Sequence, residues 1–448
     1  MLSRLRQTYL AIFREHPFLL PFAVITGAGQ TAFALVNVYA LPVYLVQDLH
    51  LSGLALGAAS ATFLLSETML KFPMGRWSDR VGRKPFVVLG PLCVLLNPAL
   101  FISLPARLWY LIFPIRVADG VGAAALWPPL FAAVGDMVRD RSRAAAMSVM
   151  NTVYVAAVGG AMVIGSLSAH FTGSHHSAFF LASGFLLVSA VTAYLGFPRA
   201  PIPPAEETPV RDANGEIVTD PAEKRVKGRL LVMVLVISVV MSAGVLILSN
   251  FLVLYLKIDL AFTDLQIAYL IAVLAAAVLG LGLPLGHAAD RWGTRNAVRL
   301  SLAISGLAMW LIPSCRGMAT LIPVAVILVL GHILGTPSWL AVVSQLGSAK
   351  NRGGVMGLIA TGEGVGAVVG PVLGGWLWDM HHPWIFYGSA LLLSAAALLA
   401  FTVLPKLPSF GADGGPSASS GSPPGSAKPP VRQAHGKPRG KSRGGPEQ

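Results

Sequence analysis

The sequence predicts an all-α membrane protein in which twelve transmembrane helices form two pseudo-symmetric six-helix bundles. Three observations predict this fold class. Hydrophobic residues make up 54% of the 448 positions, about 242 side chains, and twelve crossings of about 20 apolar residues each need about 240. Charged residues make up only 12%, about half of the ~25% found in soluble proteins. The third observation is an internal repeat with a nearly constant offset.

So little charge cannot cover the surface of a water-soluble globule, and the composition therefore excludes a soluble enzyme, a secreted protein and a disordered scaffold. Residues 144–198 hold 55 positions without a formal charge, which is enough for two membrane crossings. Arg14 and Glu15 lie where a cleavable signal would have its apolar core, so we expect the first apolar run to remain as a span. The expected spans are 18–46, 53–74, 85–104, 108–133, 145–169, 177–197, 230–256, 264–285, 297–314, 319–345, 355–378 and 384–404.

The basic excess of the chain, a net charge of +13, follows from membrane topology. With the N-terminus inside, 28 of the 33 Lys and Arg residues lie in cytoplasmic segments. This asymmetry obeys the positive-inside rule. We therefore expect a multi-pass protein of the plasma (cytoplasmic) membrane, the inner membrane of the cell, with both termini cytoplasmic. Because topology explains the charge, no nucleic acid partner is expected.

The internal repeat divides the chain into two similar halves. Residues 44–49 (YLVQDL) recur as 255–260 (YLKIDL), and residues 75–84 (GRWSDRVGRK) recur as 286–295 (GHAADRWGTR), in both cases 211 positions later. Since each half then has an even number of crossings, we expect the halves to be related by an axis along the membrane normal.

Two segments outside the repeat are polar. The segment between the halves is rich in proline and mixed charge, and the C-terminal tail is rich in Gly, Ser and Pro with a basic cluster, so neither can enter lipid and the tail is expected to be disordered. The expected organisation is an N-terminal six-helix bundle (1–198), a cytoplasmic linker (199–229), a C-terminal six-helix bundle (230–405) and a disordered basic cytoplasmic tail (406–448).

The strongest local motif is G-x-x-x-D-R-x-G-R-K, which follows the second span in a short inner loop. Glycine permits a tight turn there, and Asp79 can accept hydrogen bonds from free N–H groups at a helix N-terminus. Topology signalling alone would need the positive charges but neither the glycines nor the aspartate. The second copy has Thr294 in place of an arginine. The motif residues are Gly75, Asp79, Arg80, Gly82, Arg83 and Lys84, with Gly286, Asp290 and Arg291 in the second copy.

This motif resembles the loop signature between helices 2 and 3 of the major facilitator superfamily of secondary transporters, and the resemblance covers approximately residues 15–405. It implies that Asp79 faces the start of helix 11, and that Arg83 meets an acid at the cytoplasmic end of helix 4, where Asp136 lies. Such a cluster would be a cytoplasmic gate that latches the two halves together. The second copy would form a weaker latch.

Span 4 contains RVADGVGAAA at residues 116–125, which is similar to a helix-4 pattern of the same family. Arg116 is expected about 10 Å inside the membrane, where an unpaired charge costs at least ~2.5–3.5 kcal/mol. Asp119, three residues further on, shares its helix face and can pair with it. Either this pair only neutralises itself or, as the resemblance to antiporters implies, the arginine takes part in proton transfer.

Glu67 is expected near the middle of the bilayer in span 2, and its repeat partner is Val278. Desolvation of a carboxyl group there suits a residue that loads and unloads protons. The alternative is a static pair with Lys71, one helical turn away. Glu363 is a further candidate acid, but it lies near the inner end of span 11 and can serve simply as a helix cap. The proton-coupling candidates are therefore Glu67, Arg116 and Asp119.

Span 11 contains GAVVGPVLGG, in which the proline removes one backbone hydrogen bond and glycines four apart permit close helix packing. The pattern resembles the antiporter signature of the family. That signature belongs in helix 5, however, and span 5 lacks the Gly-Pro pair, which leaves the antiport direction open. The residues of the expected bend and packing surface are Gly366, Gly370, Pro371, Gly374 and Gly375.

Polar and aromatic residues inside the spans can line a substrate cavity. The candidates are Gln30, Asn37, Trp127, Tyr154, Asn250, His332 and Trp339. Histidine pairs at 175–176 and 381–382 lie in matching outer loops, where we expect them to be solvated, with metal binding as the alternative. Cys93 and Cys315 are expected to pack. No catalytic triad, phosphate-binding loop or metal-ligand set is visible in the sequence, so we expect no enzymatic activity, no cofactor and no bound metal.

We therefore expect a secondary active transmembrane transporter that works by alternating access around a site near the bilayer midplane. Its expected partners are a small-molecule substrate, protons and the lipid bilayer, and we expect a monomer. Resemblance to the drug-efflux (drug:proton antiporter) branch implies proton-coupled export of small, partly apolar molecules. The alternatives are a proton symporter or uniporter for metabolite uptake and, from another class, a non-transporting membrane sensor or assembly partner.

Overall fold

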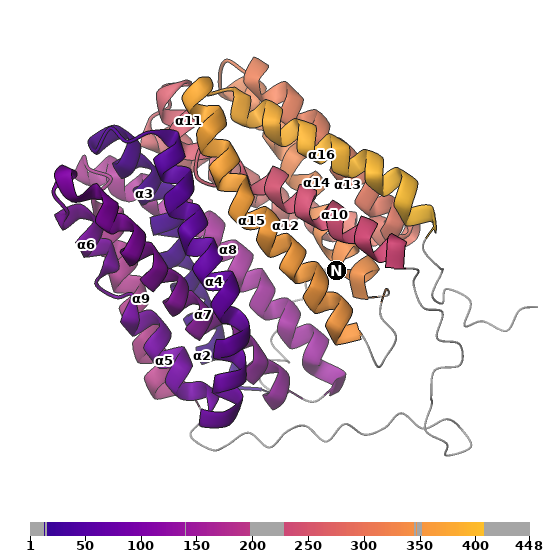
Figure 1. Ribbon diagram of the computed structural model, residues 1–448, viewed down its shortest axis with the longest axis horizontal. Helices are drawn as coiled ribbons and strands as arrows, with labels where there is room; N and C mark the ends of the chain where they lie inside the picture. Colours follow the sequence, from indigo (N-terminus) through magenta and orange to yellow (C-terminus); the bar gives the residue numbers. More distant parts are fainter. Residues whose placement is uncertain are drawn as a thin grey trace, which may run out of the picture. The chain divides into compact units, whose positions relative to one another are not determined.

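The computed structural model describes residues 13, 16–138, 140–197, 228–344, 346 and 352–406. The described part contains helices and no strand. In Figure 1 the helices of the first half run from indigo to magenta, and those of the second half from pink to yellow. The expected linker (199–229) and tail (406–448) lie outside the described residues, except for the last two residues of the linker and the first residue of the tail.

The first half consists of six helical crossings, several of which are irregular. Its elements are α2 (Leu19–Ala34), the π-helical η1 (Leu35–Ala40), α3 (Leu41–Val43), the π-helical η2 (Tyr44–Asp48), α4 (Gly53–Val81), α5 (Arg83–Cys93), α6 (Asn97–Ser103), the 3-10 helix η3 (Ala106–Leu111), α7 (Ile112–Met137), α8 (Asp140–Thr172) and α9 (Ser177–Gly196).

The second half follows the same order. Its elements are α10 (Gly228–Leu246), α11 (Leu252–Ile258), α12 (Asp264–Trp292), α13 (Thr294–Leu311), η4 (Ile312–Ser314), α14 (Met318–Ser344), α15 (Arg352–Met380), α16 (Trp384–Val403) and η5 (Leu404–Lys406).

Among the described residues, eleven helical segments are long and apolar enough to cross a membrane. The twelfth expected span corresponds to α12, whose apolar part among the described residues is the shorter stretch Asp264–Val278. Many large apolar side chains of the helices are exposed, among them Phe72, Leu195 and Leu398 at 75%, 74% and 69%. Such a surface suits lipid and not water, in agreement with the predicted fold class.

The internal repeat is visible in the backbone. His50 and Ala261 are the described non-glycine residues with positive φ, at 51° and 50°, and they lie 211 positions apart. Gly82 and Gly293, with φ of 103° and 82°, are separated by the same number of positions. The two halves therefore turn in the same way at both ends of their second crossing.

The expected inner loop at 75–84 is almost entirely helical, which corrects the sequence prediction. Helix α4 continues to Val81 and α5 begins at Arg83, so that Gly82 alone separates them. Only glycine adopts its φ of 103° without strain. Nothing between 75 and 81 breaks a helix. Asp79 consequently lies in the last turn of α4, and the first turn of α5 has no side-chain cap.

Contacts between the two halves run along two helix pairs. Helix α4 packs against α7 of its own half and against α15 of the other half, and α8 packs against α12. In Figure 1, α15 lies between the first half and the remaining helices of the second half. Two ends of the helical unit can be named by their residues: the Gly82 end, where α4 meets α5, and the Asp48 end, where η2 finishes.

Candidate functional site

The first crossing of each half is irregular at the same position of the repeat. In the first half, residues 35–40 are π-helical; in the second half, the span expected at 230–256 is interrupted between Leu246 and Leu252. An offset of 211 maps 35–40 onto 246–251. Irregular backbone at membrane depth is tolerated where it is buried in protein or lines a cavity, and interrupted helices mark binding sites in transporters.

Both irregular stretches line one cavity of about 240 Å³, which we call the central cavity. Its wall is mostly apolar and aromatic, with a few polar groups, as in small-molecule sites. One of these groups, the side-chain amide nitrogen Nδ2 of Asn250, is buried and has no hydrogen-bond partner within the described part of the chain. The lining residues are Gln30, Phe33, Ala34, Asn37, Val38, Ser60, Phe63, Leu64, Glu67, Trp127, Tyr154, Val158, Leu246, Ser249 and Asn250.

A second cavity of about 330 Å³ shares part of this wall. It is lined by Glu67, Lys71, Trp127, Pro128, Phe131, Asn151 and Tyr154. The residues common to both cavities are Glu67, Trp127 and Tyr154. The rings of Trp127 and Tyr154 meet edge to face, with centroids 5.3 Å apart. These three side chains therefore separate two spaces that a substrate or water can occupy.

Glu67 carries the only charge among the described residues that line the central cavity. The residue is 8% exposed, and its Oε1 lies 2.9 Å from Nζ of Lys71. The Lys71 side chain is 48% exposed, and an ion pair with so exposed a partner is worth little. The contact with Lys71 that the sequence suggested is thus present, with a partner that is half exposed.

Arg116 is fully buried and every part of its guanidinium has a partner. Its Nη1 lies 2.7 Å from Oδ2 of Asp119, Nε donates to the carbonyl oxygen of Ala59 at 3.3 Å, and Nη2 donates to Oδ1 of Asn37. The other carboxylate oxygen of Asp119 accepts a hydrogen bond of 2.7 Å from Asn97. The two charges thus belong to a hydrogen-bonded network that reaches the central cavity through Asn37, and the guanidinium also stacks on Phe63 of the cavity wall, 4.5 Å from the ring centroid.

Asn97 belongs to this network although the sequence analysis did not select it. The sequence does distinguish this residue, because an asparagine followed by proline is unusual inside an apolar span. Span 3 is also interrupted there: α5 ends at Cys93 and α6 begins at Asn97. The interruption places the amide of Asn97 beside Asp119.

At the Gly82 end, Arg83 connects two carboxylates. Its Nε lies 2.7 Å from Oδ2 of Asp136, and its Nη2 lies 2.9 Å from Oδ1 of Asp79. Lys84 donates to the carbonyl oxygen of Phe197 at 3.1 Å. All these partners belong to the first half.

The second copy of the motif lies only partly within the described residues. The surroundings of Gly286, the side chain of Asp290 and the first side chains of α15, which Asp79 is expected to face, lie outside the described part of the chain. Arg80 and Arg291 are exposed.

At the Asp48 end, polar contacts join the two halves. The phenol of Tyr39 in η1 donates to Oδ1 of Asp264 at 2.7 Å, and Nζ of Lys257 lies 2.6 Å from the same oxygen. The carboxylate of Asp379, at the end of α15, accepts hydrogen bonds from the first two backbone N–H groups of α4 at 2.6 and 2.8 Å. These contacts were missed from the sequence, because the partners come from crossings far apart in the chain.

The glycines of span 11 lie on two faces of α15. A Cβ built at Gly370 would lie 2.8 Å from a carbonyl oxygen of α10, and Gly366 faces α10 in the same way, whereas Gly374 faces the carbonyl of Ile247 directly after α10. Gly375 faces the backbone of Gly53, and the carbonyl of Pro371 faces Gly57. The pattern therefore allows α15 to pack closely against α10 of its own half and α4 of the other half.

Two of the seven cavity candidates lie elsewhere. His332 is exposed and contacts Thr336, while the indole of Trp339 donates to Oε1 of Glu363 at 2.9 Å. Neither lines a described cavity, whereas Gln30, Asn37, Trp127, Tyr154 and Asn250 all line the central cavity. Glu363 lies in the interior of α15, and its carboxylate accepts a hydrogen bond from Trp339. It therefore does not cap the helix, although its position in the sequence had suggested a cap.

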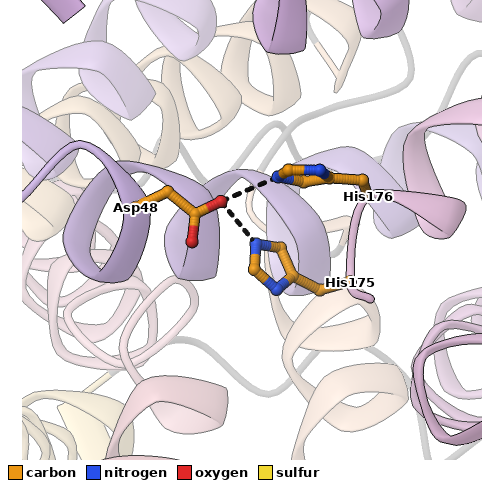
Figure 2. A group of neighbouring side chains, drawn as sticks. All are labelled: Asp48, His175 and His176. Atoms are coloured by element: carbon orange, nitrogen blue, oxygen red, sulfur yellow. Dashed lines mark hydrogen bonds and ion pairs between the residues drawn. The ribbon is translucent and has the colours of Figure 1, made fainter. Parts of the chain in front are cut away.

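We had expected both histidine pairs to be solvated, but three of the four histidines contact an aspartate. His175 and His176 both contact Asp48 (Figure 2), and His382 contacts Asp259. Burial lowers the pKa of His175, and the Asp48 carboxylate acts in the opposite direction.

The two cysteines differ in exposure. Cys315 is buried, as expected for a packing residue, and burial raises the pKa of its thiol, whereas Cys93 is exposed.

A duplicated helical membrane fold, whose halves meet around a cavity lined by irregular helices, defines a secondary transporter. The model of the Major Facilitator Superfamily matches residues 19–283 and 234–438. The chain thus belongs to the major facilitator superfamily, and it is a transporter and not an enzyme.

Curated relatives and solved structures agree with this family. "Multidrug resistance protein 1" of Bacillus subtilis is 26% identical over 369 residues, which cover 81% of this chain and 90% of that protein. "Multidrug resistance protein MdtH" of Shigella flexneri is 25% identical over 343 residues, 72% of this chain and 79% of that protein.

Two solved structures share the fold at low identity. A bacterial homolog of the human lysosomal transporter Spinster, in an inward-facing and occupied conformation, has a TM-score of 0.70 at 14% identity and covers 88% of this chain and 98% of its own. A mutant of the nucleoside transporter NupG has a TM-score of 0.67 at 13% identity, covering 87% and 99%.

Proposed function

We propose that this transporter exports small, partly apolar molecules and that protons drive the export. The observation that carries the proposal is the position of Glu67, a single carboxylate on the wall shared by the two cavities. The names of the relatives, multidrug resistance proteins, support export of drug-like molecules. The aromatic wall formed by Phe33, Phe63 and Trp127 suits apolar parts of a substrate.

One carboxylate is sufficient for coupling. A proton that crosses a membrane potential of 100 mV releases about 2.3 kcal/mol, which supports a substrate gradient of about 50-fold at 1.4 kcal/mol per decade. In the proposed cycle, Glu67 is deprotonated when substrate occupies the central cavity, and protonation releases the substrate. The free Nδ2 of Asn250 and the amides of Gln30 and Asn37 would hold the polar part of the substrate.

Arg116 and Asp119 would act through Asn37 in this mechanism. Asn37 is the member of their hydrogen-bond network that lines the central cavity, and the guanidinium of Arg116 stacks on Phe63, another residue of that wall. We therefore assign proton exchange to Glu67, and to the buried pair the role of holding Asn37 in place.

The proposed orientation places the Gly82 end in the cytoplasm, with both termini on that side of the plasma membrane and a monomer as the working unit. The positive-inside rule supports this orientation. The cluster of Asp79, Arg83 and Asp136, with the second motif copy, would be the cytoplasmic gate. Contacts of Tyr39, Asp264 and Asp379 between the halves support a closed outer side.

The alternatives receive less support. Membership in a transporter family favours transport over the sensor or assembly role. Uptake by symport or uniport would use the same cavity, and export is preferred because of the relatives' names.

Replacing Glu67 by glutamine tests the coupling. In reconstituted vesicles with an imposed pH gradient, Glu67→Gln should abolish uphill substrate movement while downhill exchange persists. Glu363→Gln is the matched control, because this acid is bonded to Trp339 away from the described cavities. Unchanged uphill transport in Glu67→Gln would remove Glu67 from the mechanism.

A further inference from the structure

Three side chains meet at the Asp48 end, away from the central cavity. Asp48 is the last residue of η2, and His175 and His176 lie in the turn between α8 and α9. Figure 2 shows both imidazole rings directed at the same carboxylate oxygen. The Nε2 atoms of His175 and His176 lie 2.9 and 2.7 Å from Oδ2 of Asp48.

The cluster is open to solvent but its rings are held in place. The side chains of Asp48, His175 and His176 are 30%, 18% and 42% exposed. The ring of His176 packs edge to face against Tyr44, with centroids 5.7 Å apart, and the two imidazoles meet edge to face at 4.8 Å. The backbone N–H of His176 donates to Oγ of Ser174 at 3.2 Å, which fixes the turn.

The spacing of the three ligand atoms is close to that of a metal site. All three lie within 4.8 Å of one another. A tetrahedral zinc ion with bonds of about 2.0–2.2 Å needs ligand atoms about 3.3 Å apart, so each imidazole would have to move outward by about half an ångström. Lys257 is the positive charge near His175, and this charge is already paired with Asp264 at 2.6 Å.

We propose that Asp48, His175 and His176 bind one zinc ion, with a water molecule as the fourth ligand. Two imidazole nitrogens and one carboxylate oxygen suit Zn²⁺, whereas calcium and magnesium require more oxygen ligands. The ion would tie the end of the first crossing to the turn between α8 and α9. The site is separate from the proposed export mechanism and does not depend on it.

The second half supplies an internal control. Asp259 is the repeat partner of Asp48, and His381 and His382 occupy the corresponding turn. There, however, only His382 contacts the acid among the described residues, through Nδ1 at 3.0 and 3.1 Å from the two oxygens. The ring of His382 is stacked on Trp378, with centroids 3.9 Å apart. The two turns contain the same residue types, but two histidines contact the aspartate in the first half and, among the described residues, only one does so in the second half.

Zinc binding to the full chain tests the proposal. The protein is purified in detergent without a polyhistidine tag, freed of metal, and titrated with ZnCl₂ in a calorimeter and against a chromogenic zinc indicator. We expect one ion bound by the wild type, with binding weakened at least about tenfold in His176→Gln and in Asp48→Asn. His382→Gln is the matched control and should bind as the wild type does.

The same titration contains the outcomes that would overturn the proposal. A wild type that binds no zinc, or a His176→Gln variant that binds zinc as tightly as the wild type, would show that the cluster is not a metal site. An equal loss in His176→Gln and His382→Gln would point to unspecific binding by surface histidines. Thermal unfolding of each variant without metal shows that it is folded, and His175→Gln provides a second variant should Asp48→Asn not fold.

Discussion

The buried pair of Arg116 and Asp119 shows how a charged side chain is tolerated at membrane depth when an opposite charge lies beside it. Each carboxylate oxygen of Asp119 has its own donor, Arg116 or Asn97, and the guanidinium is fully bonded. Removing one member of such a pair leaves a buried charge without compensation, whereas replacing both by apolar residues can be neutral.

This asymmetry predicts the stability of two variants. Arg116→Met should destabilise the protein by about 3–5 kcal/mol, because the buried Asp119 would lose the partner that compensates its carboxylate. The double variant Arg116→Met/Asp119→Leu should recover most of that loss. Thermal unfolding in detergent measures both. Equal unfolding temperatures for wild type and Arg116→Met would contradict the network.

At the residue scale, the sequence predicted polar groups within spans better than it predicted their partners. Glu67, Asn37 and Asn250 stand out in apolar runs, and all three line the central cavity. Tyr39 and Asp379 could not be selected, because a tyrosine in a span and an aspartate at a helix end are ordinary. Their partners lie 225 and more than 320 positions away, and only the fold brings them together.

At the element scale, the spans followed from length and hydropathy but their irregularities did not. The first and seventh spans read as continuous apolar runs, yet η1 is π-helical and a break separates α10 from α11. Irregular backbone of this kind is stabilised by tertiary contacts, such as that of Asn37 with Arg116. Those contacts are invisible to a pattern of single residues.

The pairing of α4 with α15 gives a prediction for one glycine. A Cβ at Gly57 would collide with the carbonyl of Pro371, which is backbone and cannot move aside. Gly57→Ala should therefore force the helices apart, cost about 1–3 kcal/mol and impair transport. Thermal unfolding and substrate flux in vesicles measure the two effects.

Gly160 provides the control for this variant. No atom lies within 4 Å of a Cβ built at Gly160 in α8, and alanine is the better helix former by about 0.5–1 kcal/mol. Gly160→Ala should leave stability equal or higher and flux unchanged. If Gly57→Ala behaved in the same way, close contact between α4 and α15 would not be required.

At the scale of the whole molecule, the two halves share a backbone but not their charges. Glu67 corresponds to Val278 at the offset of 211. At the offset of 212 that aligns Trp127 with Trp339, Arg116 corresponds to Leu328. The duplication therefore explains the symmetric turns at Gly82 and Gly293, while the ionisable residues at membrane depth are concentrated in the first half.

Alternating access predicts that the two ends of the molecule open in turn. Leu54 and Leu265 are exposed repeat partners at the Asp48 end, and Val81 and Trp292 are exposed repeat partners at the Gly82 end. Each pair, changed to cysteine in a Cys93→Ser/Cys315→Ser background, can carry two spin labels. When substrate or pH is changed, the distance between labels should increase at one end and decrease at the other.

Substitutions of the gate residues test whether this motion is controlled from the Gly82 end. Asp79→Ala removes the carboxylate that is expected to face the start of α15 across the gate, so it should increase the population in which the Val81–Trp292 distance is long and the Leu54–Leu265 distance is short. Arg291→Ala, at an exposed residue of the second copy, should have the smaller effect, since Thr294 stands in that copy where the first has Arg83. Distances that increase or decrease together at both ends would exclude a rocking motion controlled from the Gly82 end. Distances that are the same with and without Asp79→Ala would exclude it as well.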